Sequence, residues 1–131
     1  MNQAWQAATR QGDVEQVGYL LGAGADINAR DDYGQTALMN AARRGQIELV
    51  RLLVERGAAL NTTAKYNLTA LMLAIINGHT EIAHILIQVG ADGSIRGTGA
   101  PGFYNKTAFM LAEERGQREV VEWLKVAGTT E

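Results

Sequence analysis

Hydrophobic and polar positions follow one another along the chain in a pattern that predicts pairs of short helices. The segment from Thr36 to Gly45 opens with a good N-capping residue, continues through helix formers and stops at glycine. After Gly45, apolar residues at positions 49, 50, 52 and 53 fall along one face of a helix. We therefore expect a first helix within 36–45 and a second within 46–56, ending at Gly57.

This pattern recurs along the chain with a spacing of 33 residues. Four residue types keep this spacing over three occurrences and reappear once more after 38 residues, which indicates an insertion of five residues. Chance is a poor explanation for four columns that share one spacing, so the chain is read as an internal repeat. The columns are Gly12, Gly45, Gly78 and Gly116; Glu15, Glu48, Glu81 and Glu119; Leu20, Leu53, Leu86 and Leu124; and Ala8, Ala41, Ala74 and Ala112.

Polar, turn-rich segments connect one helix pair to the next. The segment 28–34 is typical of a hairpin-like connection. Gly34 and its counterparts Asn67 and Asn105 belong to the residue types that most readily adopt positive φ, which predicts a left-handed turn at each. Neither helix of a pair is long enough to be stable alone, and each exposes an apolar stripe, so we expect the pairs to stack.

Three short segments carry the signature of a known repeat family. The residues TALM at 36–39, TALM at 69–72 and TAFM at 107–110 resemble the T-P-L-H motif of the ankyrin-repeat family, and 78–92 resembles its second half. Methionine stands where the family has histidine; we expect it to fill the same space without the histidine's hydrogen bonds.

The resemblance implies an all-α ankyrin-repeat solenoid. It consists of four stacked helix-turn-helix units joined by β-hairpin-like loops, in a single domain over 1–131. The repeats are expected at about 1–30, 31–63, 64–101 with the hairpin insertion, and 102–131, the first and last acting as caps.

Composition and charge narrow the range of partners. Twelve Lys and Arg against fourteen Asp and Glu give a net charge of −2, so no global field favours nucleic acid or an anionic membrane. The chain has no cysteine, which excludes disulfides, thiolate zinc sites and cysteine nucleophiles. No apolar stretch approaches membrane-spanning length and the start lacks a secretory pattern, so we expect a cytoplasmic protein.

Candidate catalytic and cofactor motifs are weak. The segment Gly97–Gly102 fits G-x-G-x-x-G, but the next helix is expected only near position 107, so nucleotide binding there is the weaker alternative. His79 and His84 lie five residues apart, about 140° around a helix, and do not converge on one metal. His79 is interpreted as a structural residue at a helix start and His84 as a solvated residue. We expect no enzyme, cofactor, metal or small-molecule substrate.

The expected concave face carries the candidate binding residues. Hairpin tips and first helices line this face in repeat solenoids, and the resemblance implies that it binds a protein partner. Tyrosines mark the tips, Leu68 and Ile76 are expected to add exposed apolar area, and a partial basic strip that includes Arg10 and Arg115 would suit an acidic partner segment. The candidates are Tyr33, Gln35, Arg43, Arg44, Lys65, Tyr66, Leu68, Ile76, Phe103 and Tyr104.

The sequence therefore favours a monomeric, non-enzymatic protein-protein interaction module. The alternative from another class of function is a structural or engineered repeat scaffold without a natural ligand. The insertion at 96–105 is open to two interpretations: a mobile finger that orders on a partner, or a tolerated loop whose aromatic residues fold back onto the last cap.

Overall fold

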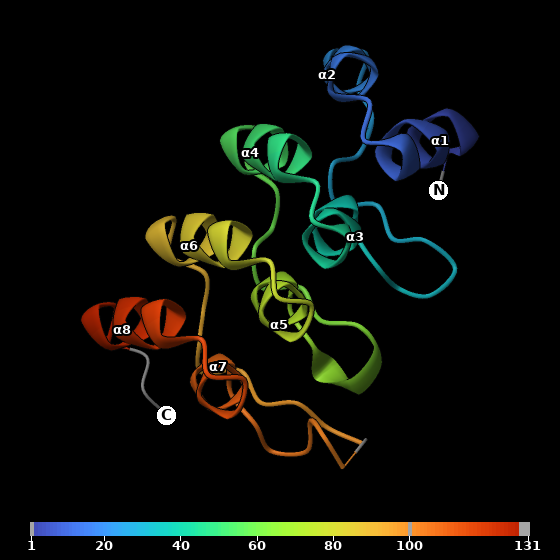
Figure 1. The fold of residues 1–131 in the computed structure, drawn as a ribbon. Helices are drawn as coiled ribbons and strands as arrows, with labels where there is room; N and C mark the ends of the chain where they lie inside the picture. The colour runs from blue at the N-terminus through green and yellow to red at the C-terminus, as the bar shows by residue number, and fades with distance from the viewer. Residues whose placement is uncertain (1, 100, 129–131) are drawn as a thin grey trace.

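Eight short α-helices and no β-strand make up the part of the chain that the structure describes, residues 2–99 and 101–128 (Figure 1). The coordinates are those of a computed structural model. A single 3₁₀ turn, η1 (Lys65–Asn67), precedes the fifth helix. The helices are α1 (Gln3–Gln11), α2 (Val14–Gly22), α3 (Ala37–Arg44), α4 (Ile47–Glu55), α5 (Ala70–Ile76), α6 (Thr80–Gln88), α7 (Ala108–Glu114) and α8 (Arg118–Val126).

The eight helices form two layers of a curved stack. Helices α1, α3, α5 and α7 lie in one layer beside the hairpin loops, and α2, α4, α6 and α8 form the other (Figure 1). Each helix pair packs on the next pair within both layers, including the last step from α5 and α6 to α7 and α8. The expected all-α solenoid of stacked helix pairs is confirmed.

Threonine caps start three of the first-layer helices. The buried hydroxyls of Thr36, Thr69 and Thr107 accept hydrogen bonds from the backbone N–H three residues further on, which satisfies a group that the first helical turn leaves unpaired. Met72 adds a reciprocal bond, because its Sδ accepts from the N–H of Thr69 at 3.4 Å. The expectation that methionine only fills space is therefore wrong at Met72.

A polar side chain at the start of each later second-layer helix bonds back to the preceding repeat. Gln46 Nε2 donates to the carbonyl oxygen of Arg10 at 3.2 Å, and Gln117 Nε2 donates to that of Ile75 at 2.8 Å. His79 Nε2 lies 3.0 Å from the carbonyl oxygen of Arg43, so the structural interpretation of His79 holds. These bonds reach carbonyls in the last turns of α1, α3 and α5, where N–H donors of the same helix run out. The Ile75 carbonyl also accepts from the N–H of Gly78 at 3.2 Å.

His84 is not simply solvated, as the sequence had suggested. Its ring stacks on Trp123 of the following repeat, with centroids 4.0 Å apart and planes 12° from parallel. The two side chains contact each other across neighbouring repeats, a relationship that helix position alone does not reveal.

The insertion lies against the preceding hairpin. Gly97 N–H donates to the Lys106 carbonyl at 2.9 Å, and Thr98 N–H donates to the Tyr66 carbonyl at 2.7 Å. The Phe103 and Tyr66 ring centroids are 5.7 Å apart, so Phe103 packs on Tyr66. Ala100 lies outside the described residues; the described part of this glycine-rich segment follows no strand, which its interpretation as a nucleotide-binding loop requires.

Candidate functional site

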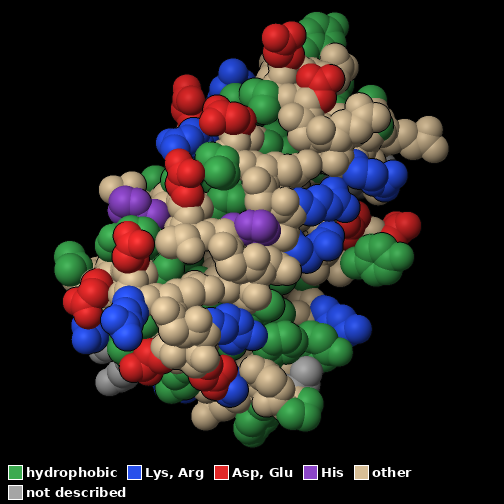
Figure 2. Space-filling view, viewed as in Figure 1, with side chains coloured by type: hydrophobic (Ala, Val, Ile, Leu, Met, Phe, Trp, Pro, Cys, Tyr) green, Lys and Arg blue, Asp and Glu red, His purple; other side chains and the backbone are tan. Residues whose placement is uncertain are grey.

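An open hollow lies on the hairpin side of the first layer, where α1 and α3 end. Its volume is about 420 Å³. Figure 2 shows Lys and Arg side chains gathered over the ends of these two helices. We call it the basic hollow. The residues that line it are Arg10, Asp31, Tyr33, Gln35, Asn40, Arg43, Arg44 and Lys65.

Asp31 organises the hairpin beside the basic hollow. Its Oδ1 accepts from the backbone N–H groups of Tyr33 and Gln35, each at 2.9 Å, and its Oδ2 accepts from Asn40 Nδ2 at 3.1 Å. Burial raises the pKa of Asp31, but these hydrogen bonds and the positive charge of Arg43 together hold that pKa below its ordinary value. Asp31 is thus an ionised residue that fixes the hairpin to α3.

The arginines of the basic hollow lack carboxylate partners within the described residues. Arg43 Nη2 donates to Asn40 Oδ1 at 2.9 Å, and neither Arg10 nor Arg44 makes an ion pair there. Elsewhere the surface pairs such charges, as Arg51 does with Glu81 at 3.0 Å. The basic hollow therefore presents positive charge that the described residues do not neutralise with an ion pair.

The three hairpin tyrosines differ in how far they project. Tyr33 is 83% exposed and Tyr104 is 68% exposed, whereas Tyr66 is half-buried. Tyr66 also has φ of 61°, unusual for a bulky side chain, and the ammonium of Lys65 lies 4.9 Å from the centre of its ring. The predicted left-handed turns at Gly34, Asn67 and Asn105 are confirmed; the positive φ of Tyr66 is additional.

A comparison with protein-family models accounts for this arrangement of helices and hairpins. The model described as ankyrin repeats, in three copies, matches residues 5–97, which is more than half of the chain. The chain belongs to the ankyrin-repeat family. In a search of curated proteins, no sequence matched it. The α7–α8 pair lies beyond the matched residues, yet it packs on the third ankyrin repeat as that repeat packs on the second.

The ankyrin-repeat architecture overturns the expected exposure of Leu68. Only 6% of Leu68 is exposed, so the prediction that it adds apolar surface is wrong. Leu68 directly precedes the capping Thr69, and Leu73 stands at the fourth position of α5; an apolar pair at these positions is the pattern of a hydrophobic staple. Both leucines belong to the core. This spacing is the signal in the sequence that could have identified Leu68 as buried.

Two further candidates expose less apolar surface than the sequence suggested. Ile76 is half-buried against the core at the end of α5, and Phe103 is half-buried against Tyr66. Gln35 and Lys65 line the basic hollow, as do Arg43 and Arg44. The buried Oε1 of Gln35 accepts no hydrogen bond from the described residues.

The basic hollow also includes residues that the candidate list omitted. Arg10 belonged to the expected basic strip but not to that list, and neither Asp31 nor Asn40 was a candidate. The repeat register does place Arg10 and Arg43 33 residues apart on consecutive first helices. The hydrogen bonds of Asp31 depend on side-chain directions that register does not give.

Metal-ion clusters and membrane-spanning helices are absent from the described residues. Over residues 2–99 and 101–128, no group of three His, Asp or Glu side chains is arranged to hold a metal ion. Within the same residues, no helix is both long enough and apolar enough to cross a membrane.

Proposed function

We propose that this ankyrin-repeat chain is a non-enzymatic module that binds a protein partner through its first-layer helices and hairpin tips. Ankyrin repeats are generally protein-protein interaction modules, which supports the coarse assignment. The observation that carries the choice of face is the 83% exposed Tyr33 at the rim of a hollow whose arginines have no ion-pair partner among the described residues.

Tyr33 has the properties of an interface anchor. Tyrosine and arginine are enriched among the residues that dominate binding energy, because each offers a large contact area together with directional hydrogen bonds. The backbone of Tyr33 is held by Asp31, which limits the conformational entropy lost on binding.

The binding face extends beyond the basic hollow. A standard interface buries roughly 800 Å² on each partner, so a partner that fills the basic hollow would also cover neighbouring hairpin tips. Tyr66, Phe103 and Tyr104 form the proposed second part of the face, and half-buried Ile76 lies at its edge. Leu68 is left out because it is buried.

Site-specific photo-crosslinking tests the face directly. A photoreactive phenylalanine analogue replaces Tyr33 or Tyr104, and in a control chain it replaces Tyr19, which is 70% exposed on α2 in the second layer. We expect one protein to be captured from positions 33 and 104 and not from position 19. Capture from position 19 alone would place the binding face on the second layer.

The captured protein then serves in a quantitative assay. The purified partner should bind the Tyr33→Ala chain about tenfold or more weakly, as expected for loss of an anchor worth roughly 1–2 kcal/mol. Tyr19→Ala should bind as the unmodified chain does, and both variants should keep their helical content and Tm. If no position captures a protein above background, the structural or engineered scaffold becomes the better account.

The proposal further takes the module to be a monomer that acts in the cytoplasm. Light scattering at micromolar concentration should give a mass near 14.1 kDa, the mass of one chain. Fractionation of cells that produce a tagged chain checks the location.

A further inference from the structure

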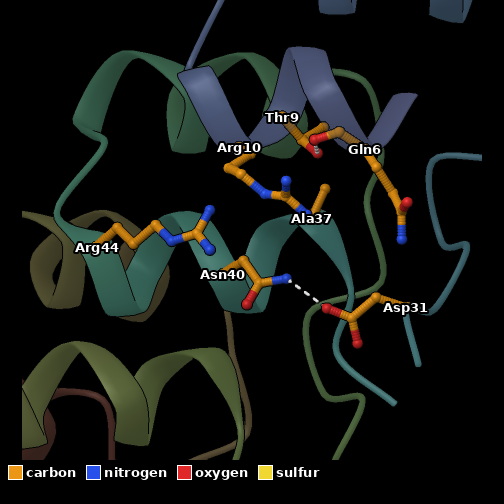
Figure 3. A pocket seen from close by; sticks show the side chains of 7 residues that line it. All are labelled: Gln6, Thr9, Arg10, Asp31, Ala37, Asn40 and Arg44. Carbon is orange, nitrogen blue, oxygen red and sulfur yellow. Dashed lines mark hydrogen bonds between the residues drawn. The ribbon is translucent and has the colours of Figure 1, made fainter. Parts of the chain in front are cut away.

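Two arginines from neighbouring repeats reach into the same inner corner of the basic hollow. Figure 3 shows Arg10 extending from α1 and Arg44 from α3, both above Asn40. The inner pocket that they line has a volume of about 40 Å³. The other residues around it are Gln6, Thr9, Asp31, Ala37 and Asn40.

No ion pair within the described residues holds either of these two positive charges, although the ionised carboxylate of Asp31 lines the same pocket. Asp31 is the carboxylate that lines the pocket, and its two oxygens already accept from Tyr33, Gln35 and Asn40. Neither Arg10 nor Arg44 makes an ion pair in the described structure. Two like charges that share a pocket repel each other, and an anion between them converts that repulsion into attraction.

The helix dipole does not account for the direction of these side chains. A cation is favourable in the last turn of any helix, and that explains why arginines occur there. Arg115 occupies the position of Arg44 in the last repeat, after α7. The Nη1 of Arg115 lies 3.4 Å from the Leu111 carbonyl and 3.6 Å from Glu114 Oε1. Residues of its own helix therefore supply both the hydrogen-bond acceptor and the opposite charge for this guanidinium. Arg44 has no such partner and lines the pocket instead.

The geometry of the donors in the pocket favours a carboxylate as the anion. A cavity needs roughly 10–15 Å³ to hold one water, so the inner pocket of about 40 Å³ has room for a small group such as a carboxylate. The planar fork of a guanidinium matches the two oxygens of a carboxylate, and two such forks face this pocket.

We propose that the pocket between Arg10 and Arg44 binds the carboxylate of an aspartate or glutamate side chain of the protein partner. This assignment rests on the proposed function and names the chemistry that the face recognises. The rest of an acidic segment then lies along Arg43 and Lys65, which line the outer part of the basic hollow.

A peptide-binding assay tests the proposal without knowledge of the partner. The probe is a fluorescein-labelled dodecapeptide of alternating glutamate and glycine, and its glutamine counterpart is the neutral control; binding is followed by anisotropy at low ionic strength. We expect saturable binding of the glutamate peptide and none of the glutamine peptide. Arg10→Gln and Arg44→Gln should each weaken binding roughly tenfold, the effect of losing a charge-assisted hydrogen bond.

Arg115→Gln provides the matched control. It removes the same charge at the equivalent helix end and should leave the peptide affinity within about twofold of the unmodified chain. In NMR spectra, the side-chain Nε–H signals of Arg10 and Arg44 should shift on peptide addition, while that of Arg115 stays in place.

Three results would overturn the proposal. The first is unchanged affinity in the Arg10→Gln and Arg44→Gln chains; the second is an equal loss in Arg115→Gln, which would mean that only net charge attracts the peptide. The third is at least tenfold tighter binding of a phosphoserine peptide of matched charge, which would make the pocket a phosphate site. If the crosslinked partner binds the Arg10→Gln/Arg44→Gln chain normally, the proposed protein-binding function stands and the carboxylate assignment fails.

Discussion

The imidazole of His79 lies directly against the backbone of Gly45, at the junction of the second and third repeats. A Cβ atom at Gly45 would fall 2.6 Å from Cε1 of His79, closer than real side chains approach. The same ring bonds the carbonyl of Arg43 through Nε2 at 3.0 Å. Gly45 is thus required both for its φ of 78° and for the room that it leaves to the histidine.

Replacing Gly45 should destabilise the chain more than replacing other turn glycines. Gly57→Ala and Gly78→Ala are matched controls, because both glycines have positive φ and neither would place a Cβ within 4 Å of another residue. We expect each control to lower the free energy of unfolding by about 1–2 kcal/mol. Gly45→Ala should lower it by about 2–5 kcal/mol, because the crowding adds to the backbone strain. Urea denaturation measures all three.

A double variant separates crowding from backbone strain. His79→Ala removes the ring, so the cost of Gly45→Ala measured in the His79→Ala background should fall to that of the two controls. If the cost is the same with and without the ring, the close approach of His79 contributes nothing to the requirement for glycine.

Asn67 and Asn105 allow the contribution of one hydrogen bond between neighbouring hairpin segments to be measured. Both have positive φ, at 57° and 60°. Asn67 Nδ2 also donates to the Arg96 carbonyl at 3.0 Å, whereas the described structure gives the side chain of Asn105 no hydrogen bond. Asn67→Ala should therefore cost about 0.5–1.5 kcal/mol more than Asn105→Ala in thermal unfolding. Equal costs would show that the bond to Arg96 adds no stability.

The fold could be predicted from the sequence because each repeat contains local signals for its helices and its turn. Column spacing identified the helix pairs, and the residues at 34, 67 and 105 identified the left-handed turns, since both signals depend on local backbone geometry. The packing of the insertion against Tyr66 depends on a backbone bond between Thr98 and Tyr66, 32 positions apart in the sequence. No local pattern encodes that contact.

The candidate site was less predictable than the fold. Tyr33 and the arginines were found because residue type and register placed them on the hairpin side of the stack. The burial of Leu68 was missed because its column also holds polar residues, Gln35 and Lys106. The role of Asp31 was missed because it depends on Asn40, which lies one helix turn into α3 and whose orientation only the three-dimensional structure gives.

Asp31 should make the stability of the chain depend on pH. A carboxyl whose pKa is lower in the folded state adds stability above its unfolded pKa, about 3.9, and that contribution is lost as the pH falls through the folded pKa. Asp31→Asn should therefore be less stable than the unmodified chain between pH 5 and 7, and the difference should shrink below about pH 4. Chemical denaturation at several pH values measures the difference.

Asp32→Asn serves as the control for Asp31. Asp32 is the exposed neighbour and accepts no hydrogen bond in the described structure. A difference between the Asp31→Asn and unmodified chains that stays constant from pH 7 to below pH 3 would show that the ionised carboxylate is not what holds the hairpin.

Leu68 should matter for stability and not for binding. Because only 6% of Leu68 is exposed, Leu68→Ala should lower the free energy of unfolding by about 2–3 kcal/mol. Ile76→Ala, at a half-buried position, should cost about 1 kcal/mol. At temperatures where both variants are folded, Leu68→Ala should bind the crosslinked partner as tightly as the unmodified chain. A tenfold loss of affinity in Leu68→Ala, with the helical content intact, would mean that Leu68 contacts the partner after all.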